Sequence, residues 1–179
     1  MKKITTWTLS MLAYSAFLMA PAMAQQNPAL SDAEVASVAV VANQIDIDFG
    51  KIAREKSKNA EVLKFAQTMI NDHQAVIDQA VALVTKLKVT PQDNAVSKKL
   101  LADAEHTKAM LRAQKGDAFN KAYIDNEVAY HKAVIGAVEG LLIPEAENGA
   151  LKQLLQDVVP ALKAHLEHAE MAQKMFARK

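Results

Sequence analysis

The chain has 179 residues, of which 51% are hydrophobic, and its 21 basic residues nearly balance its 20 acidic ones. That balance gives no reason to expect binding to nucleic acid or to an anionic membrane surface, since both attract strongly basic proteins. The chain has no cysteine, which excludes disulfides, thiol catalysis, thiolate metal sites and covalent haem attachment.

The amino-terminal segment has the three parts of a secretory signal peptide. Lys2 and Lys3 give a positive start, a mostly apolar stretch covers 7–19, and Ala22 and Ala24 fit the small-residue cleavage rule. A retained membrane anchor is the alternative, but the apolar stretch is shorter than the about 20 residues that span a bilayer. We therefore predict export to the periplasm, with no transmembrane segment left after cleavage.

The predicted organisation is a signal peptide at 1–24, a flexible start at 25–30 and one helical domain at 31–179. Cleavage would leave 155 residues and change the net charge from +1 to −1, because two lysines are lost. A domain of this size can bury a hydrophobic core without the help of disulfides.

The composition favours helix, because glycine and proline are scarce while alanine, leucine and lysine are abundant. Ser31 and Glu34 form a capping-box pattern before an apolar-periodic run. Pro91 stops the second helix, and Gly116 follows the third. The predicted helices cover 31–57, 59–88, 95–114, 117–143 and 149–177, and Pro144 is expected to begin the last turn.

Four of the predicted helices are long, and each carries a core-facing stripe of apolar residues at steps of three and four. In the second helix the stripe includes Val62, Ala66, Met69, His73 and Val76. This repeat keeps one side of a helix against its neighbours. We predict an all-α fold: a ferritin-like four-helix bundle, with the short helix in the crossover between two hairpins.

His73, His131 and His165 all fall on core-facing stripes, one on each of three long helices. Imidazole suits zinc, copper, iron and nickel, so these three residues are the candidate metal ligands. At about 1.5 Å per residue, His73 and His131 lie near mid-height, and His165 is expected about 9 Å away. Glu127 could be a further ligand or an orienting carboxylate, whereas Asp46 lies beside the stripe of the first helix.

Two interpretations of the histidines stay open. One is a metal or cofactor site, and the other is a set of neutral, hydrogen-bonded histidines that fix the register of the helices. A di-iron ferritin centre is excluded because Ile70, Val128 and Leu162 stand where Glu-x-x-His motifs need glutamate. No nucleophile–base pair or glycine-rich phosphate loop occurs, so we predict no catalytic activity of its own and no catalytic residues.

Three segments together resemble a known family: 65–73, 123–131 and 159–166. They are similar to the periplasmic ferritin-like bundles called domain of unknown function 4142, often labelled outer membrane proteins. The resemblance implies a helical bundle and export, and it maps the family's recurring histidines onto His73, His131 and His165. It implies no agreed activity.

Small helical proteins of this kind are also similar to accessory subunits of membrane-bound quinoprotein alcohol dehydrogenases. The main hypothesis is therefore a non-catalytic accessory protein of the bacterial envelope, with a protein partner and no cofactor of its own. The alternative is a metal-binding or stress-protective bundle, in which His73, His131 and His165 hold a divalent transition metal.

Overall fold

The computed structural model describes residues 29–176, and the predicted signal peptide lies outside these residues. The predicted all-α bundle is confirmed: the described residues form helices joined by short loops and contain no strand. Within the same residues, no helix has the length and apolarity needed to cross a membrane. The elements are α1 (Asp32–Lys56), α2 (Ala60–Leu87), α3 (Ala95–Ala113), α4 (Gly116–Ala137), the π-helical segment η1 (Val138–Leu142), α5 (Ile143–Glu145) and α6 (Gly149–Phe176).

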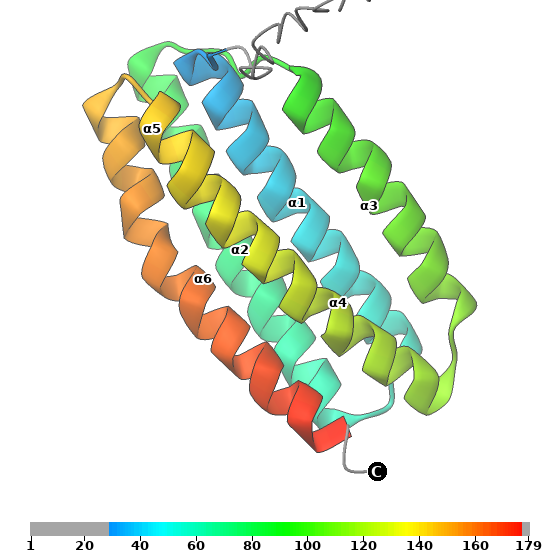
Figure 1. The fold of residues 1–179 in the computed structure, drawn as a ribbon. Helices are drawn as coiled ribbons and strands as arrows, with labels where there is room; N and C mark the ends of the chain where they lie inside the picture. Colours follow the sequence, from blue (N-terminus) through cyan, green and yellow to red (C-terminus); the bar gives the residue numbers. More distant parts are fainter. Residues whose placement is uncertain (1–28, 177–179) are drawn as a thin grey trace, which may run out of the picture.

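Two helical hairpins form the bundle. The helices α1 and α2 pack together, as do α4 and α6, and α3 lies along the outer side of α1 (Figure 1). The third helix is thus the crossover between the hairpins, as predicted. All four long helices run nearly the full length of the molecule, so residues at mid-height of each can meet in the centre (Figure 1).

Side-chain caps fix the starts of the first three helices. Ser31 and Glu34 form the predicted capping box at α1, and Asn59 accepts hydrogen bonds from the first turn of α2. Asn94 caps α3 in the same way and exchanges hydrogen bonds with Ser97. These side chains satisfy amide groups that a helix cannot pair internally, so the observed starts lie within one or two residues of the predicted ones.

The predicted end of the fourth helix at Pro144 is wrong. The chain continues through η1 and α5 to Glu145, and Pro144 sits in the first turn of α5, where no backbone N–H is needed. The turn lies at 146–148, where the Asp32 carboxylate accepts hydrogen bonds from the amides of Glu147 and Asn148. Helix α4 and its extension therefore reach farther along the bundle than the sequence indicated.

The first hairpin is tightly packed at Gly50. A Cβ atom at this position would lie 2.9 Å from Ile70 Cγ1 and 3.1 Å from the carbonyl oxygen of Ala66. These distances are shorter than ordinary van der Waals contacts. The absence of a side chain at Gly50 thus lets α1 and α2 approach each other.

Buried apolar side chains form two core clusters. The first core cluster contains Phe49, Phe65, Phe119 and Tyr123 together with aliphatic residues of α1, α2, α4 and α6. The second core cluster, nearer α5, is aliphatic. Along α4 and α6, the residues between the two clusters include His131 and His165. The larger members of the second core cluster are Val35, Val38, Ile135, Val138, Leu142, Leu151, Leu155 and Leu162.

Candidate metal centre

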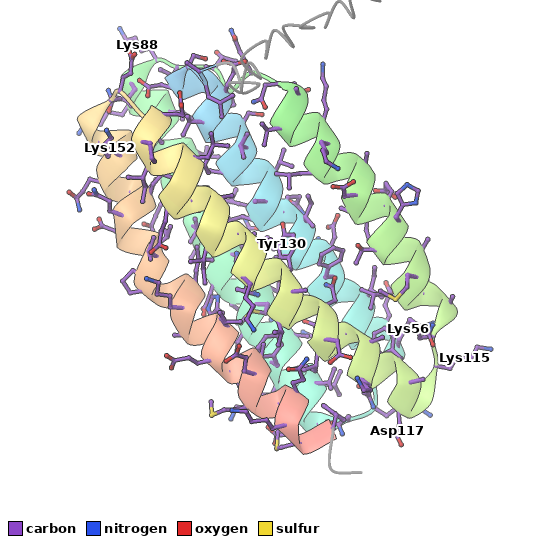
Figure 2. The ribbon with its side chains drawn as sticks, in the orientation of Figure 1. Lys56, Lys88, Lys115, Asp117, Tyr130 and Lys152 are labelled. Atoms are coloured by element: carbon purple, nitrogen blue, oxygen red, sulfur yellow. The ribbon has the colours of Figure 1, made fainter. Side chains whose placement is uncertain are left out.

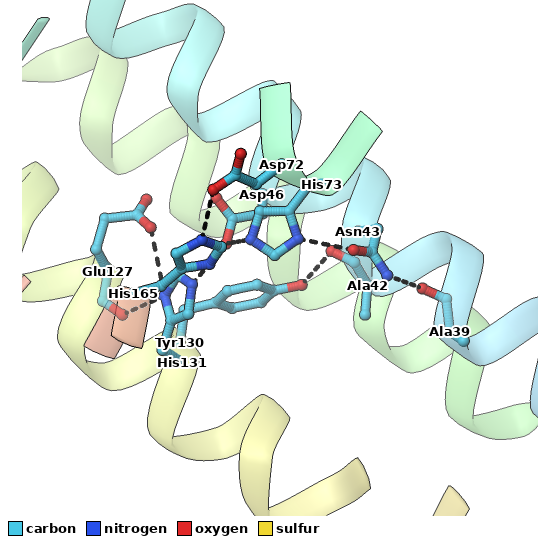
Figure 3. A network of polar contacts seen from close by, with 10 residues as sticks. All are labelled: Ala39, Ala42, Asn43, Asp46, Asp72, His73, Glu127, Tyr130, His131 and His165. Atoms are coloured by element: carbon cyan, nitrogen blue, oxygen red, sulfur yellow. Dashed lines mark hydrogen bonds and ion pairs between the residues drawn. The ribbon is translucent and has the colours of Figure 1, made fainter. Parts of the chain in front are cut away.

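The three predicted metal ligands meet in the centre of the bundle (Figure 3). The ring centroids of His73, His131 and His165 are 5.3–5.7 Å apart, and all three side chains are buried. One ring nitrogen from each histidine lies within 4.8 Å of those of the other two. The structure therefore places three potential ligand atoms around one point.

The expected displacement of His165 by about 9 Å is wrong. The height estimate placed the last turn at Pro144, whereas the turn actually lies at 146–148. Measured from there, His131 is about 16 residues away on one side and His165 about 18 residues on the other. At 1.5 Å per residue the two differ by only about 3 Å in height, which side chains easily span.

A hydrogen bond on the outer side of the cluster holds the His73 ring. Its Nδ1 lies 2.7 Å from Asn43 Oδ1, and Asn43 Nδ2 donates to the carbonyl oxygen of Ala39 at 2.8 Å (Figure 3). Because the Asn43 amide nitrogen is engaged, its oxygen is the acceptor, so the proton sits on Nδ1 of His73. Nε2 of His73 then carries a lone pair.

The other two rings are held in the same manner. His131 Nδ1 donates to the carbonyl oxygen of Glu127 at 3.0 Å, and His165 Nε2 donates to Asp72 Oδ2 at 2.9 Å. Carbonyl and carboxylate oxygens can only accept, so these nitrogens are the protonated ones. Within the described chain, the opposite nitrogens make no hydrogen bond: Nε2 of His73, Nε2 of His131 and Nδ1 of His165.

Asp46 joins the histidines from α1. Its Oδ2 lies 3.3 Å from His73 Nε2 and 3.5 Å from His131 Nε2, and the residue has no exposed surface. The expectation that Asp46 lies beside the core-facing side of the first helix is therefore wrong. Helix α1 packs against α2, α3 and α4. More of its surface is therefore buried than the single apolar stripe that the sequence pattern indicates.

Glu127 is a second fully buried carboxyl group at the cluster. Its Oε2 lies 3.6 Å from His131 Nδ1, while its backbone carbonyl accepts the hydrogen bond from the same nitrogen. Potential ligand atoms of Asp46, Glu127 and His131 also lie within 4.8 Å of one another. Glu127 was predicted as a second ligand or an orienting carboxylate; the group that accepts from His131 is its backbone carbonyl, and the role of its carboxyl group stays a prediction.

Burial determines the charge state of these groups. It lowers the pKa of His73 to about 3, with a further contribution from His131, and lowers the pKa of His131 to about 4. It also raises the pKa of Asp46 to about 8 and that of Glu127 well above its usual range. Neutral imidazoles are the metal-binding form of histidine, so at neutral pH the rings of His73 and His131 are ready to coordinate a cation.

Aromatic packing closes one side of the cluster. Tyr130 lies midway along α4, remote from the charged ends of the bundle marked by Lys56, Lys88 and Lys152 (Figure 2). Its ring meets the ring of Phe49 edge to face at 5.4 Å, and its hydroxyl donates to the carbonyl oxygen of Ala42 at 2.8 Å. These contacts anchor Tyr130 beside the neighbouring His131.

The residue set fits a four-coordinate transition metal. Ligand bonds of about 2.0–2.2 Å in a tetrahedral site place the ligand atoms about 3.3–3.6 Å from one another. The contacts from Asp46 Oδ2 to His73 Nε2 and His131 Nε2 are 3.3 and 3.5 Å. The inward nitrogens have no hydrogen-bond partner in the described chain, and a bound cation would supply one for each of them.

Sequence reasoning missed Asn43 and Asp72. Asn43 lies one turn from Asp46 on α1, and Asp72 directly precedes His73 but is half exposed on the side of α2 that faces α6. Neither stands on an apolar stripe, so periodicity gave no reason to select it. A search for polar residues next to a core histidine would have found Asp72, whereas Asn43 lies near only Asp46, which the stripe pattern did not select.

Comparison with solved structures finds a similar fold. "CopM in the Cu(II)-bound form" matches with a TM-score of 0.62 and 16% sequence identity, covering 82% of this chain and 98% of that one. At this identity the likeness establishes the fold. Comparison with curated proteins gives no significant match. The model of the family described as "Domain of unknown function (DUF4142)" matches residues 18–172, so the chain belongs to this family.

Proposed function

We propose that the protein binds a first-row transition metal ion through His73, His131 and His165, with Asp46 as the fourth ligand. One observation carries the proposal: each histidine donates its outer N–H to a protein acceptor and turns an unpaired nitrogen inward. This arrangement is typical of metal-bound histidine, in which an outer hydrogen bond fixes the ring and its tautomer.

The competing interpretation, that the histidines only fix helix register, accounts less well for these contacts. Buried polar groups that serve a structural role normally have hydrogen-bond partners, because an unpaired one costs about 1–3 kcal/mol. Three inward nitrogens without such partners, beside two fully buried carboxyl groups, form a large exception in a single place. A cation would compensate all of them together.

Copper and zinc are the best candidates for the ion. Three imidazoles and one carboxylate make a nitrogen-rich set, and affinity for such divalent ions rises along the first row to a maximum at copper. The Cu(II)-bound state named for the similar CopM structure supports testing copper first. We infer that the site serves to bind the ion, as in sequestration or delivery.

Of the two hypotheses drawn from the sequence, we therefore prefer the metal-binding bundle to the accessory subunit of a dehydrogenase. The geometry of the histidine cluster supports metal binding, whereas no feature of the described residues points to a dehydrogenase partner. The accessory role stays a prediction that rests on resemblance alone. Export to the periplasm likewise stays a proposal that rests on the predicted signal peptide.

The test is titration of metal-free protein with Cu(II) and with Zn(II), followed by elemental analysis after dialysis. We expect one ion per chain in the wild type and loss of that ion in His131→Ala. His106→Ala is the matched control, because His106 is exposed on α3 and should leave the stoichiometry unchanged. Equal metal contents in His131→Ala and the wild type would refute the proposal, as would a wild type that retains no ion.

A further inference from the structure

Two methionines on the last helix are exposed to solvent. Met171 and Met175 of α6 are 57% and 48% exposed, whereas Met69 is fully buried in the first core cluster. The inward stripe of this part of α6 is formed by Ala169 and Ala172, so the two methionines stand outside it. Methionine is among the residues most often buried, and packing within this chain does not account for two exposed ones at neighbouring positions.

The two methionine side chains are spaced so that their sulfur atoms can meet. Residues four apart on a helix are neighbours on its surface, with Cβ atoms about 5–6 Å apart. Sulfur–metal bonds of about 2.3 Å place two sulfurs at most about 4.6 Å apart across one ion. Methionine has three rotatable bonds, so Met171 and Met175 can both reach such an ion without any change in the helix.

A histidine lies on the same side of α6. His168 precedes Met171 by three residues, and at 3.6 residues per turn His168, Met171 and Met175 fall within an arc of about 60°. The ring of His168 meets the ring of Phe65 edge to face, with the centroids 5.0 Å apart. This contact holds a half-buried imidazole beside Met171. Within residues 29–176, neither nitrogen of that ring is hydrogen-bonded or paired with an acid.

The charges around these side chains suit a cation. Glu167 is exposed one turn before Met171 and makes no ion pair within the described part of the chain. Its carboxylate therefore leaves negative charge beside the methionines. The lysines nearby are directed to another acid: Lys132 is paired with Glu170 at 2.7 Å, and Lys174 also interacts with Glu170.

The ligand types determine which cation fits. Thioether sulfur is a soft ligand that selects Cu(I), whereas hard cations such as Mg²⁺ and Ca²⁺ require oxygen ligands. We propose that Met171, Met175 and His168 form a second metal site, on the surface of α6, which binds a soft monovalent ion, either Cu(I) or Ag(I). This site shares no residue with the central histidine cluster, so it is independent of the function proposed above.

The test is titration of the protein with Ag(I) in chloride-free buffer, followed by NMR signals of the methionine methyl groups. We expect saturable shifts of the Met171 and Met175 methyl signals and of the His168 ring signals. Met110 is exposed on α3 without a second thioether beside it, so its signal should respond only at Ag(I) concentrations at least tenfold higher. Equal responses of the three methionines, or no shift at Met171 and Met175, would refute the proposal.

Variants and a second ion locate the site and its selectivity. The double variant Met171→Leu and Met175→Leu keeps apolar side chains of similar size at two exposed positions, and it removes both sulfurs. The Ag(I) concentration that half-saturates the His168 signals should rise at least tenfold in this variant and stay unchanged in the control Met110→Leu. Zn(II) should leave the methionine signals unshifted.

Two results would contradict the surface site: unchanged Ag(I) affinity in the double variant, and equal shifts of the methionine signals by Zn(II) and Ag(I). The proposed ligands of the central cluster include no methionine. The methionine signals therefore report on the surface site alone, and failure of this test leaves the proposed central site intact.

Discussion

Oδ2 of Asp46 on α1 and Nε2 of His131 on α4 lie 3.5 Å apart, and each residue belongs to a different helical hairpin. The other histidines divide in the same way, with His73 on the first hairpin and His165 on the second. A metal ion held by these residues would link the two hairpins at mid-height. Binding should therefore affect the stability of the whole bundle.

We predict that Cu(II) or Zn(II) raises the melting temperature of the metal-free protein in a concentration-dependent way. An ion that binds only the folded chain adds about 2.7 kcal/mol at a free concentration of 100 times its Kd. Calorimetric melting over a series of metal concentrations measures the effect. His131→Ala should show no such rise, and a similar rise in that variant would place the bound ion elsewhere.

Asp46 makes the stability of the metal-free protein depend on pH. Burial raises its pKa from 3.8 to about 8, so its stabilising contribution is complete below pH 3.8 and is lost as the pH rises through 8. The lowered pKa values of His73 and His131 have the opposite effect, because they make stability rise with pH. They do so only below pH 6.5, the ordinary pKa of histidine. Between pH 6.5 and 8, the change of the free energy of unfolding with pH is therefore determined by the buried carboxyl groups.

We therefore predict that the free energy of unfolding falls between pH 6.5 and 8, by up to about 1.4 kcal/mol per pH unit for each carboxyl group. Asp46→Asn cannot ionise and should show a shallower slope. Urea unfolding of metal-free protein at several pH values measures both. A wild-type stability that rises over this interval would contradict the assigned protonation of Asp46.

Asn43 should act on the metal only through His73. Asn43→Ala removes the acceptor that fixes the Nδ1 proton, so the ring loses its preferred tautomer and orientation. Loss of such an outer partner typically weakens metal binding 10- to 100-fold. Asn71→Ala is the matched control, because Asn71 is exposed on α2 and bonds Gln67. Calorimetric titration measures the metal affinity of both variants. Equal metal affinities would exclude a role for Asn43 in metal binding.

Two glycines should respond oppositely to alanine. Gly50→Ala introduces a methyl group 2.9 Å from Ile70 Cγ1 and should lower the free energy of unfolding by about 1–3 kcal/mol. A Cβ at Gly136 on α4 meets nothing within 4 Å, so Gly136→Ala should stabilise the fold by about 0.5–1 kcal/mol. Urea unfolding measures both, and stabilisation by Gly50→Ala would show that α1 and α2 are less closely packed.

Much of the fold could be predicted because its signals are local. The Ser31 capping box and the spacing of apolar residues depend only on neighbours along one helix, and they gave the helices nearly to the residue. The end of α4 could not be predicted in this way. Pro144 ordinarily interrupts a helix, but here the π-helical segment before it lets the chain continue to Glu145.

The candidate site was only partly predictable, because it depends on how the helices are arranged. The histidines stood on apolar stripes and could be selected, since a polar residue there must be buried. Asp46 could not, because its burial follows from the packing of three helices around α1. Asp72 lies half exposed beside His165, a contact between α2 and α6 that no pattern within either helix indicates.

The most direct test of the metal site is a crystal structure of the metal-loaded protein with an anomalous difference map at the metal edge. We predict one peak within about 2.0–2.2 Å of Nε2 of His73, Nε2 of His131, Nδ1 of His165 and a carboxylate oxygen of Asp46. His165 is the one histidine of the three expected to bind through Nδ1, because its Nε2 donates a hydrogen bond to Asp72. A peak on surface residues only, or none at the cluster, would contradict metal binding by these histidines.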